Sequence, residues 1–482
     1  MPPGITIVGL GPGDPGLITR RAWQALQGAD EVWLRTAQHP AAQAVPAARR
    51  RSFDDLYERA DDCAQVYAAI VERLLALGSR PQGVVYAVPG DPTVGEATLA
   101  ALRQAEAPGL EVIHGVSFVE PCLQALGLDA LDGLVLADAL ELAARHHPPF
   151  PPDLPALIGQ LHSTWVAADV KLTLFNQYAE DHTVRLIHAA GTPAQRVHAL
   201  PLHDLDRAPE IGALTALFVP PRPEASAFET LQETVAHLRA PEGCPWDREQ
   251  TPESLRAHLL EEAYECLQAI DAGDDAVLAE ELGDLLLQIV LQAQIATEGG
   301  AFRMADVIAG IQGKIVRRHP HVFGAAHVEG VEQVLHNWET LKAAERGADG
   351  GGLLDGVPAA LPALAQADEI QVRVARVGFD WPDAAGVLAK IAEELAEVQA
   401  APDPATRAGE VGDLLFSVVN YARHLGVDPE SALRQANRRF RRRFGRLETA
   451  ARGHGRALQV LGPQALDDLW EAAKGDEADE GS

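Results

Sequence analysis

The pattern of apolar and polar residues divides the chain into two halves. Up to about residue 220, short apolar runs such as Ile5–Leu10 and Val84–Val88 end in glycine or proline, and helical patterns such as Cys63–Leu77 lie between them. Weaker strand candidates at Glu111–Ile113 and Leu134–Ala137 continue this alternation. Strands that alternate with helices are typical of an α/β domain with a largely parallel sheet.

The second half of the chain has a helical pattern. The proline-rich segment Val219–Glu224 cannot continue a helix or a central strand, so it predicts a linker. From Ala227 to Lys474 apolar residues recur at helical spacing, with a glycine-rich break at Gly347–Gly352. The acidic tail Gly475–Ser482 is expected to fray.

Four short motifs occur twice in the helical half, in the same order. Two are acidic, one is basic and one begins with tryptophan, and the copies lie between 125 and 132 residues apart. They are Glu261-Glu262-Ala-Tyr-Glu265 with Glu393-Glu394-Leu-Ala-Glu397, Glu281-Leu-Gly-Asp284 with Glu410-Val-Gly-Asp413, Lys314–Arg318 with Arg439–Arg443, and Trp338–Lys342 with Trp470–Lys474. Any one match arises easily by chance, but four in register indicate an internal duplication.

The acidic motifs predict a metal site. Residues three apart on a helix share a face, so Glu262 projects with Glu265, and Glu281 with Asp284. The turn-forming segment Asp271–Asp275 makes the two helices antiparallel neighbours. Converging carboxylates repel each other, and a hard divalent cation relieves that repulsion; oxygen ligands without nearby Cys or His favour Mg²⁺ or Mn²⁺. The same reasoning predicts a second site at Glu394, Glu397, Glu410 and Asp413.

A solvated surface is the competing interpretation of these motifs. A single EExxE helix is usually an exposed acidic face, but the paired ExxD motif and the duplication favour a site. The basic pairs, four residues apart, suit phosphate oxygens. Trp338 and Trp470 can stack on a base or pack in a core, and each is followed by a lysine, Lys342 or Lys474.

At these residues the sequence resembles the MazG family of nucleoside triphosphate pyrophosphohydrolases. The resemblance extends over residues 228–474 and includes Cys244–Thr251, Arg317–Gly324 and Gly378–Trp381. It implies an all-α, usually dimeric fold that holds Mg²⁺. It also implies hydrolysis of a nucleoside triphosphate between the α and β phosphates, giving the monophosphate and pyrophosphate.

The resemblance implies roles for the repeated residues. The expected metal ligands are Glu262, Glu265, Glu281 and Asp284 in the first module and Glu394, Glu397, Glu410 and Asp413 in the second. Glu261 and Glu393 are supporting or general-base candidates. The expected nucleotide contacts are Lys314, Arg318, Trp338, Lys342, Arg439, Arg443, Trp470 and Lys474. The second module departs from the first by having Arg439 where lysine is common and 12 rather than 15 residues between its acidic motifs.

The N-terminal loop Gly9–Gly16 contains a GxGxxG pattern, but its two prolines disfavour a dinucleotide-binding loop. It resembles instead the first loop of the tetrapyrrole methylases, an S-adenosylmethionine-binding fold, and Val88–Thr93 and His114–Ser117 fit two further features. Trp33–Thr36 with His39-Pro40 is more similar to the YabN-type proteins, in which a methylase-like domain precedes MazG modules. The implied cofactor contacts are Gly9, Gly11, Gly13, Asp14, Gly90, Asp91 and Pro92.

Composition excludes several classes of function. The formal net charge of −29 disfavours direct nucleic-acid binding, so a polyanionic substrate needs a metal bridge or a local basic pocket. Four scattered cysteines without a CxxC pair argue against a zinc site or disulfide scaffold and for the cytoplasm. No apolar run is long enough to span a membrane, and the N-terminus lacks the charged region of a signal peptide.

We therefore predict a multidomain chain: a tetrapyrrole methylase-like α/β domain at residues 1–221, followed by all-α MazG modules at 227–345 and 360–475. Its expected function is Mg²⁺-dependent removal of unwanted nucleoside triphosphates. Two alternatives stay open, a methyltransferase whose helical half serves oligomerisation and a sensor that binds nucleotides without turnover. Long apolar helix faces predict a homodimer or a higher homo-oligomer. The sequence does not determine base preference or which module catalyses.

Overall fold

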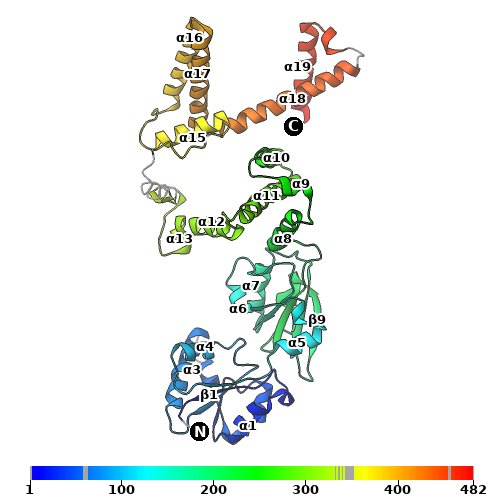
Figure 1. Cartoon of the computed structure of the whole chain (residues 1–482), viewed down its shortest axis with the longest axis vertical. Coiled ribbons are helices and arrows are strands. Elements are labelled where there is room, and N and C mark those ends of the chain that lie inside the picture. The colour runs from blue at the N-terminus through cyan, green and yellow to red at the C-terminus, as the bar shows by residue number, and fades with distance from the viewer. Residues whose placement is uncertain are drawn as a thin grey trace. The chain divides into compact units, whose positions relative to one another are not determined.

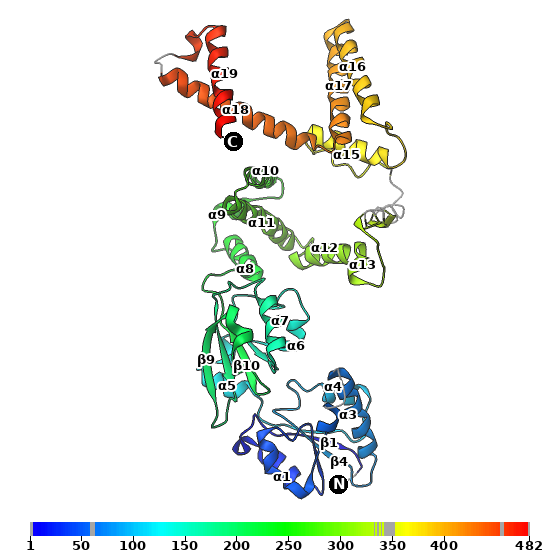
Figure 2. The same ribbon diagram turned by 180° about the vertical axis from the view of Figure 1, so that it is seen from behind.

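The computed structural model describes residues 3–57, 63–331, 333–334, 337–338, 340–341, 352–453 and 457–480. It divides into two compact units, Met1–Gln250 and Thr251–Ser482 (Figures 1 and 2). The first unit contains two sheets, and the described part of the second is built from helices. This confirms the predicted fold class. Within the described residues, none of the helices is both long and apolar enough to cross a bilayer.

The first sheet has five strands in the order β3-β2-β4-β1-β5, and every pairing in it is parallel. Its strands are β1 (Ile5–Gly9), β2 (Val32–Leu34), β3 (Arg50–Ser52), β4 (Val84–Val88) and β5 (Glu111–Ile113). Helix α1 (Arg20–Gly28) packs on one face, and α3 (Cys63–Gly78) and α4 (Ala97–Gln104) pack on the other. Because both faces are covered, β1 and β4 are buried along their whole length.

The second sheet, in the order β6-β7-β10-β8-β9, differs from the prediction. Only β6 (Val135–Asp138) and β7 (Ala156–Gly159) are parallel; β8 (Thr183–His188), β9 (Arg196–Pro201) and β10 (Thr215–Val219) pair antiparallel. The expectation of a largely parallel sheet is therefore wrong here. The physical reason is the short loop between β8 and β9, which is too short for a parallel crossover. Helix α5 (Val119–Leu126) covers one face, and α6 (Ala139–Ala143) and α7 (Thr164–Leu174) cover the other.

Two further helices, α8 (Phe228–Arg239) and α9 (Pro245–Glu249), belong to the first unit. The Asp153 carboxylate holds the start of α8. It accepts hydrogen bonds from the backbone N–H groups of Ser226 at 2.7 Å and Ala227 at 3.1 Å, and from the Thr230 hydroxyl at 2.6 Å. These bonds lower the pKa of Asp153. The beginning of α8 is thus tied to the α/β unit by a residue far away in sequence.

The second unit is organised around helix pairs. Its elements are α10 (Arg256–Ala272), α11 (Asp275–Glu298), α12 (Met304–Arg318), α13 (Pro320–Phe323), α15 (Ala363–Ala375), α16 (Ala384–Ala400), α17 (Pro404–His424), α18 (Pro429–Gly453) and α19 (Pro463–Glu480). The predicted turn between α10 and α11 is confirmed: Gly273 ends α10 with φ of +68°, and the Asp274 carboxylate caps α11. Helices α16 and α17 form the equivalent pair in the second module.

The apolar stripes of these pairs are only partly covered within the chain. Leu260 and Ile270 on α10 and Leu282 on α11 have exposed fractions of 56%, 58% and 50%. In the second module Leu388 and Leu415 are each 53% exposed. The helical period put these residues on one face, but a two-helix hairpin has too few neighbours to bury it.

Two candidate metal centres and a cavity in the first unit

The first module brings three of its four predicted metal ligands together. Glu262 and Glu265 on α10 and Glu281 on α11 each offer a carboxylate oxygen, and all three oxygens lie within 4.8 Å of one another. Burial raises the pKa of Glu262, and the charges of Asp284 and Glu265 raise it further. Burial and Glu265 raise the pKa of Glu281 in the same direction. Asp284 is exposed and lies outside the group of three.

The second module repeats this arrangement. Carboxylate oxygens of Glu394, Glu397 and Glu410 lie within 4.8 Å of one another, and Asp413 is exposed and outside the group. Burial and the charge of Glu394 raise the pKa of Glu397. Each module thus offers three hard oxygen ligands, a donor set that suits Mg²⁺ or Mn²⁺.

A fixed cation distinguishes the two clusters. The Lys390 ammonium lies 2.8 Å from a Glu394 oxygen and 2.9 Å from a Glu393 oxygen. Glu394 is 5% exposed, and an ion pair of this kind makes such burial tolerable. The corresponding residue of the first module is His258, whose Nδ1 lies 3.8 Å from Glu261. Lysine at this position was not singled out from the sequence, although it lies one turn before the acidic motif.

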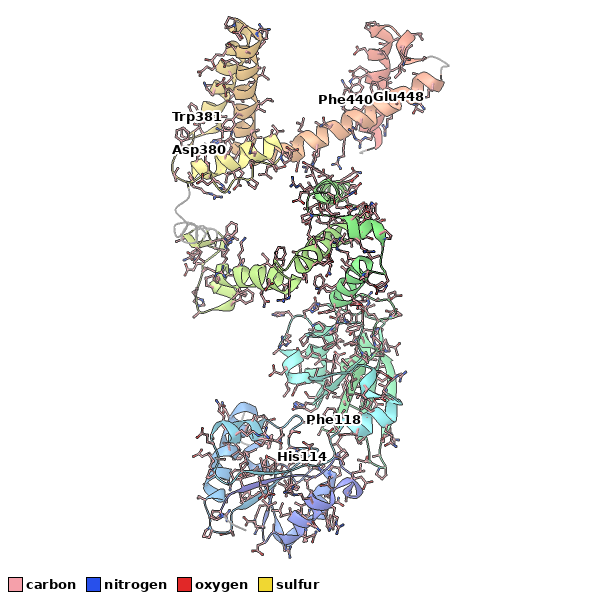
Figure 3. All side chains as sticks on the ribbon, viewed as in Figure 1. His114, Phe118, Asp380, Trp381, Phe440 and Glu448 are labelled. Carbon is pink, nitrogen blue, oxygen red and sulfur yellow. The ribbon has the colours of Figure 1, made fainter. Side chains whose placement is uncertain are left out.

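The tryptophans of both modules lie beside cations. The Arg318 guanidinium is 5.9 Å from the centre of the Trp338 ring, and the Lys474 ammonium is 5.9 Å from the centre of the Trp470 ring. Trp470 also packs on Phe440 of α18, with ring centres 5.0 Å apart (Figure 3 labels Phe440). Lys342 lies outside the described residues.

The remaining basic candidates lie on α12 and α18. Lys314 is on α12, and Arg439 and Arg443 are on α18. Helix α19 packs against α18, at the end of α18 away from the α16–α17 pair (Figures 1 and 2). Trp470 and Lys474 on α19 are therefore placed away from the carboxylate cluster of their own module.

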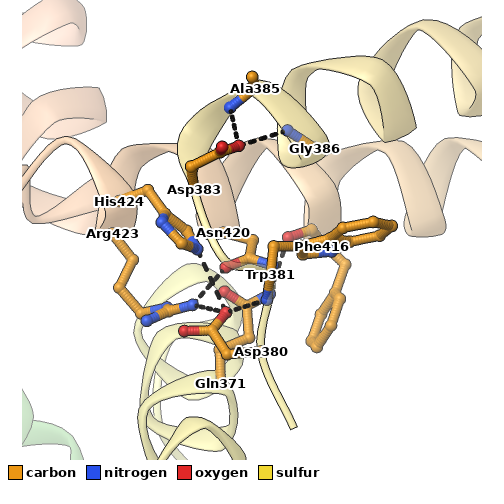
Figure 4. Close-up of polar contacts among 10 residues, drawn as sticks. All are labelled: Gln371, Asp380, Trp381, Asp383, Ala385, Gly386, Phe416, Asn420, Arg423 and His424. Carbon is orange, nitrogen blue, oxygen red and sulfur yellow. Dashed lines mark hydrogen bonds and ion pairs between the residues drawn. The ribbon is translucent and has the colours of Figure 1, made fainter. Parts of the chain in front are cut away.

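The Gly378–Trp381 motif connects the segment before α16 with the end of α17 in the second module (Figure 4). The Asp380 carboxylate accepts hydrogen bonds from Arg423, from the Trp381 backbone N–H at 2.8 Å and from His424 at 3.2 Å. Burial acts to raise the pKa of Asp380, but the bonds from Arg423 and His424 outweigh it and lower the pKa. Asp380 therefore ties the start of α16 to the end of α17, the helix that carries Glu410.

In the first unit most of the predicted cofactor residues have a structural role, because they shape the loops at residues 9–16 and 88–93. A Cβ on Gly9 would lie 2.6 Å from both the Gly115 nitrogen and the Gly90 oxygen, so glycine is needed there for backbone packing. Gly11 and Gly90 exchange backbone hydrogen bonds of 3.1 and 2.8 Å. The Asp14 carboxylate caps a short 3₁₀ helix at Pro15–Leu17. A Cβ on Gly13 would meet a side chain from the second sheet's loops, and Pro92 is buried.

Gly90 and Asp91 line a partly open cavity of about 650 Å³, whose wall also includes Gly159 of β7 and Ala216 of β10. The Asp91 carboxylate accepts bonds from Thr93 and from the backbone N–H of Gly115 at 3.0 Å, and lies 3.0 Å from His114 Nδ1. Burial opposes ionisation, but the bonds from Thr93 and His114 lower the pKa of Asp91. Phe118, which also lines the cavity, and His114 are labelled in Figure 3.

Comparison with protein families matches three stretches of the chain. Residues 4–206 match the tetrapyrrole (corrin/porphyrin) methylases, 250–323 match the MazG nucleotide pyrophosphohydrolase domain, and 379–440 match phosphoribosyl-ATP pyrophosphohydrolase. The two modules thus match different pyrophosphohydrolase families. Uroporphyrin-III-C-methyltransferase from Thermus thermophilus covers 45% of this chain and 94% of its own, with 24% identity and a TM-score of 0.36.

Curated relatives cover the chain in two ways. The uncharacterized protein YabN of Bacillus subtilis is 39% identical over 98% of both chains. The nucleoside triphosphate pyrophosphohydrolase/pyrophosphatase MazG of Thermotoga maritima is 48% identical over 52% of this chain and 96% of its own. The nucleoside triphosphate pyrophosphohydrolase of Escherichia coli K12 is 43% identical over 52% of this chain and 98% of its own.

Helix pairs with converging carboxylates, together with these matches, define a nucleotide pyrophosphohydrolase. The chain belongs to the MazG family of nucleoside triphosphate pyrophosphohydrolases, and a tetrapyrrole methylase-like domain precedes its helical half. It is therefore a hydrolase, as the resemblance to the MazG family implied.

Proposed function

We propose that the helical unit hydrolyses nucleoside triphosphates to the monophosphate and pyrophosphate with the help of Mg²⁺, and that Mn²⁺ can replace it. The observation that carries this proposal is the convergence of three carboxylates from two adjacent helices, found in both modules. A bound divalent cation supplies charge neutralisation of the triphosphate and acidifies an attacking water. Asp284 and Asp413 would complete the ligand sets after a change of side-chain rotamer, since each lies one turn after a grouped glutamate.

The remaining residues bind and orient the substrate in this proposal. Glu261 and Glu393, each next to a metal ligand in sequence, are the candidates to take up the proton of the attacking water. Lysine and arginine side chains on α12 and α18 would hold the phosphates. The Trp338 and Trp470 rings, each with a cation beside it, offer a face to the base.

We further propose a homodimer or higher homo-oligomer. The exposed apolar faces of the two helix pairs are what a second copy would cover, because patches of this kind mark protein–protein contacts. In such an assembly, Trp470 on α19 of one copy would lie beside a carboxylate cluster of the other copy. We place the domain limits at 1–221, 227–345 and 360–475. The free thiols of Cys122, Cys244 and Cys266 support a reducing compartment, the cytoplasm.

Pyrophosphate release is the test of this function. Purified protein is incubated with Mg²⁺ and each common or damaged nucleoside triphosphate in turn, and pyrophosphate and monophosphate are quantified. We expect both products in equal amounts, and none after the divalent cation is removed with a chelator. Tight binding without pyrophosphate release from any triphosphate would instead identify a nucleotide sensor and overturn the proposal.

S-adenosylmethionine-dependent methyl transfer is a second candidate function, for the first unit. It is supported by the family match over residues 4–206 and by the cavity beside the Gly90–Asp91 loop. Gly90 and Asp91 would contact the cofactor, which supplies an electrophilic methyl group when bound. Calorimetric titration with S-adenosylhomocysteine, which is not turned over, tests this candidate independently of any methyl acceptor.

A further inference from the structure

Helix α18 carries two separate rows of arginines. Arg434, Arg438 and Arg441 follow one another at intervals of four and three residues, so they share one face of the helix. Arg439 and Arg443, the phosphate contacts of the proposed function, are also four residues apart and form a second row on a neighbouring face. The two rows can therefore have different partners.

A residue of the first module contacts the first row. Asp271 lies in the last turn of α10, and its carboxylate Oδ2 is 3.3 Å from Arg438 Nη2 and 3.8 Å from Arg434 Nε. Arg438 Nη2 also donates to the backbone oxygen of Asp271 at 3.4 Å, across 167 residues of sequence. The Asp271 side chain is 14% exposed. This largely buried ion pair joins the helix that carries Glu265 to the helix that carries Arg439 and Arg443.

The position of Asp271 in its own helix explains why it requires a cation. The last carbonyl groups of a helix have no partner further along it and carry a partial negative charge. An aspartate in the last turn adds a full negative charge to that end, which is unfavourable. Arg438 compensates both charges, because it contacts the carboxylate and the backbone oxygen of Asp271. The end of α10 is thus capped by the second module.

Arg434 is held on its other side by the start of α18. Its Nη2 donates to the Ser431 hydroxyl at 2.7 Å, and the Ser431 backbone N–H donates to the Asp428 carboxylate at 2.6 Å. Asp428 directly precedes α18. These contacts connect the beginning of α18 to Asp271. They fix the rotation of α18 about its own axis and, with it, the direction in which the second row of arginines projects.

We propose that Asp271 of the first module is a positioning residue for phosphate binding by the second module. By holding Arg434 and Arg438, it sets the direction of Arg439 and Arg443 toward the substrate. This inference rests on the proposed function, because it concerns the phosphate contacts of that function. It adds that the second module requires a charged residue of the first for full affinity, whichever of the two catalyses.

The test is calorimetric titration of the full-length chain with inorganic tripolyphosphate and Mg²⁺. This probe carries the phosphate chain without a base, so base preference does not affect the result. Asp271→Asn removes the charge at nearly constant size and is expected to weaken binding about fivefold to tenfold. Asp271→Arg combined with Arg438→Asp reverses the ion pair and should bind within about threefold of the unmodified chain. Asp275→Asn, at an exposed residue of the same turn, is the matched control and should change nothing.

A second background separates positioning from a general loss of structure. In a chain that already carries Arg443→Gln, adding Asp271→Asn should change the affinity less than twofold, because the contact it positions is gone. A disturbance of folding would weaken binding equally in both backgrounds. Equal weakening overturns the proposal, as do no tripolyphosphate binding, unchanged binding by Asp271→Asn, and failure of the reversed pair to restore binding.

Pyrophosphate release by the unmodified chain is measured separately. If nucleoside triphosphates are hydrolysed and one of these four results is found, only the positioning role of Asp271 is overturned. If none of the triphosphates is hydrolysed, the proposed function fails, whereas a selective effect of Asp271→Asn on tripolyphosphate binding still supports the positioning role.

Discussion

At the scale of single residues, the two carboxylate clusters are similar but not equal. Both place three glutamates within 4.8 Å, yet only in the second does a lysine contact two of the acidic motif residues. In that cluster the Lys390 ammonium already compensates part of the negative charge. The first cluster, with His258 at the corresponding position, depends more on a bound cation.

Replacing one carboxylate in each cluster shows which module catalyses. Glu265→Gln and Glu397→Gln each remove a charged metal ligand without changing side-chain size. In a module that works, we expect Mg²⁺-dependent pyrophosphate release to fall on the order of a hundredfold or more, since positioning of the cation and water is lost. The double variant should be inactive. Glu298→Gln, a glutamate at the end of α11 outside the cluster, is the control. Activity that survives the double replacement would refute the site assignment.

At the scale of elements, long-range hydrogen bonds hold helices that local sequence does not connect. Asp380 reaches Arg423 across 43 residues of sequence and so fixes α16 against α17. This contact positions Glu394 and Glu397 on α16 opposite Glu410 on α17. The geometry of the second cluster thus depends on a residue outside it.

The pKa of Asp380 predicts a pH-dependent stability. Because the folded-state pKa lies below the unfolded value, ionised Asp380 stabilises the fold above the unfolded value near 4. That contribution is lost as the pH falls through the folded-state pKa. Asp380→Asn is expected to cost about 1–2 kcal/mol at pH 7 through lost charge-assisted hydrogen bonds, and less near pH 3.

Denaturant unfolding of Asp380→Asn between pH 3 and 7 is the corresponding measurement. The exposed Asp467→Asn is the control and should follow the unmodified chain. A destabilisation that is the same at pH 3 and pH 7 would show that the carboxylate charge of Asp380 is not what holds the helices.

The hydrogen bonds of Asp153 predict that its replacement loosens the start of α8. Asp153→Ala removes the carboxylate that accepts hydrogen bonds from Ser226, Ala227 and Thr230, so this segment should open more often. Limited proteolysis should then cut near residues 222–230 faster than in the unmodified chain. The exposed Asp169→Ala, on α7 of the same unit, should leave the cleavage rate unchanged. Equal cleavage rates in the two variants would contradict an anchoring role.

At the scale of the whole molecule, the exposed apolar helix faces predict self-association. Ile270→Lys combined with Ile289→Lys places one charge on α10 and one on α11, at residues that are 58% and 41% exposed in the single chain. Sedimentation should show a shift toward monomer, because a buried unpaired charge opposes association. Val460→Lys changes a residue that is 74% exposed and away from the helix pairs, and serves as control. A double variant that sediments like the unmodified chain would place the interface elsewhere.

Several features of the fold and the site follow from the sequence alone. Helical spacing puts Glu262 with Glu265, and Glu394 with Glu397, on shared faces. A single EExxE helix is usually an exposed acidic face, and its duplication together with the other motifs is what indicated a metal site. Apolar runs located β1 and β4 correctly, because strands buried on both faces are continuously apolar.

What only the tertiary structure decided is which side chains meet between elements. Helix pairing brought Glu281 and Glu410 to the clusters but left Asp284 and Asp413 exposed beside them. The antiparallel second sheet and the partners of Asp380 likewise arise from contacts between distant segments. The physical reason is that periodicity along one element sets its faces, whereas the crossing and packing of elements set the distances across them.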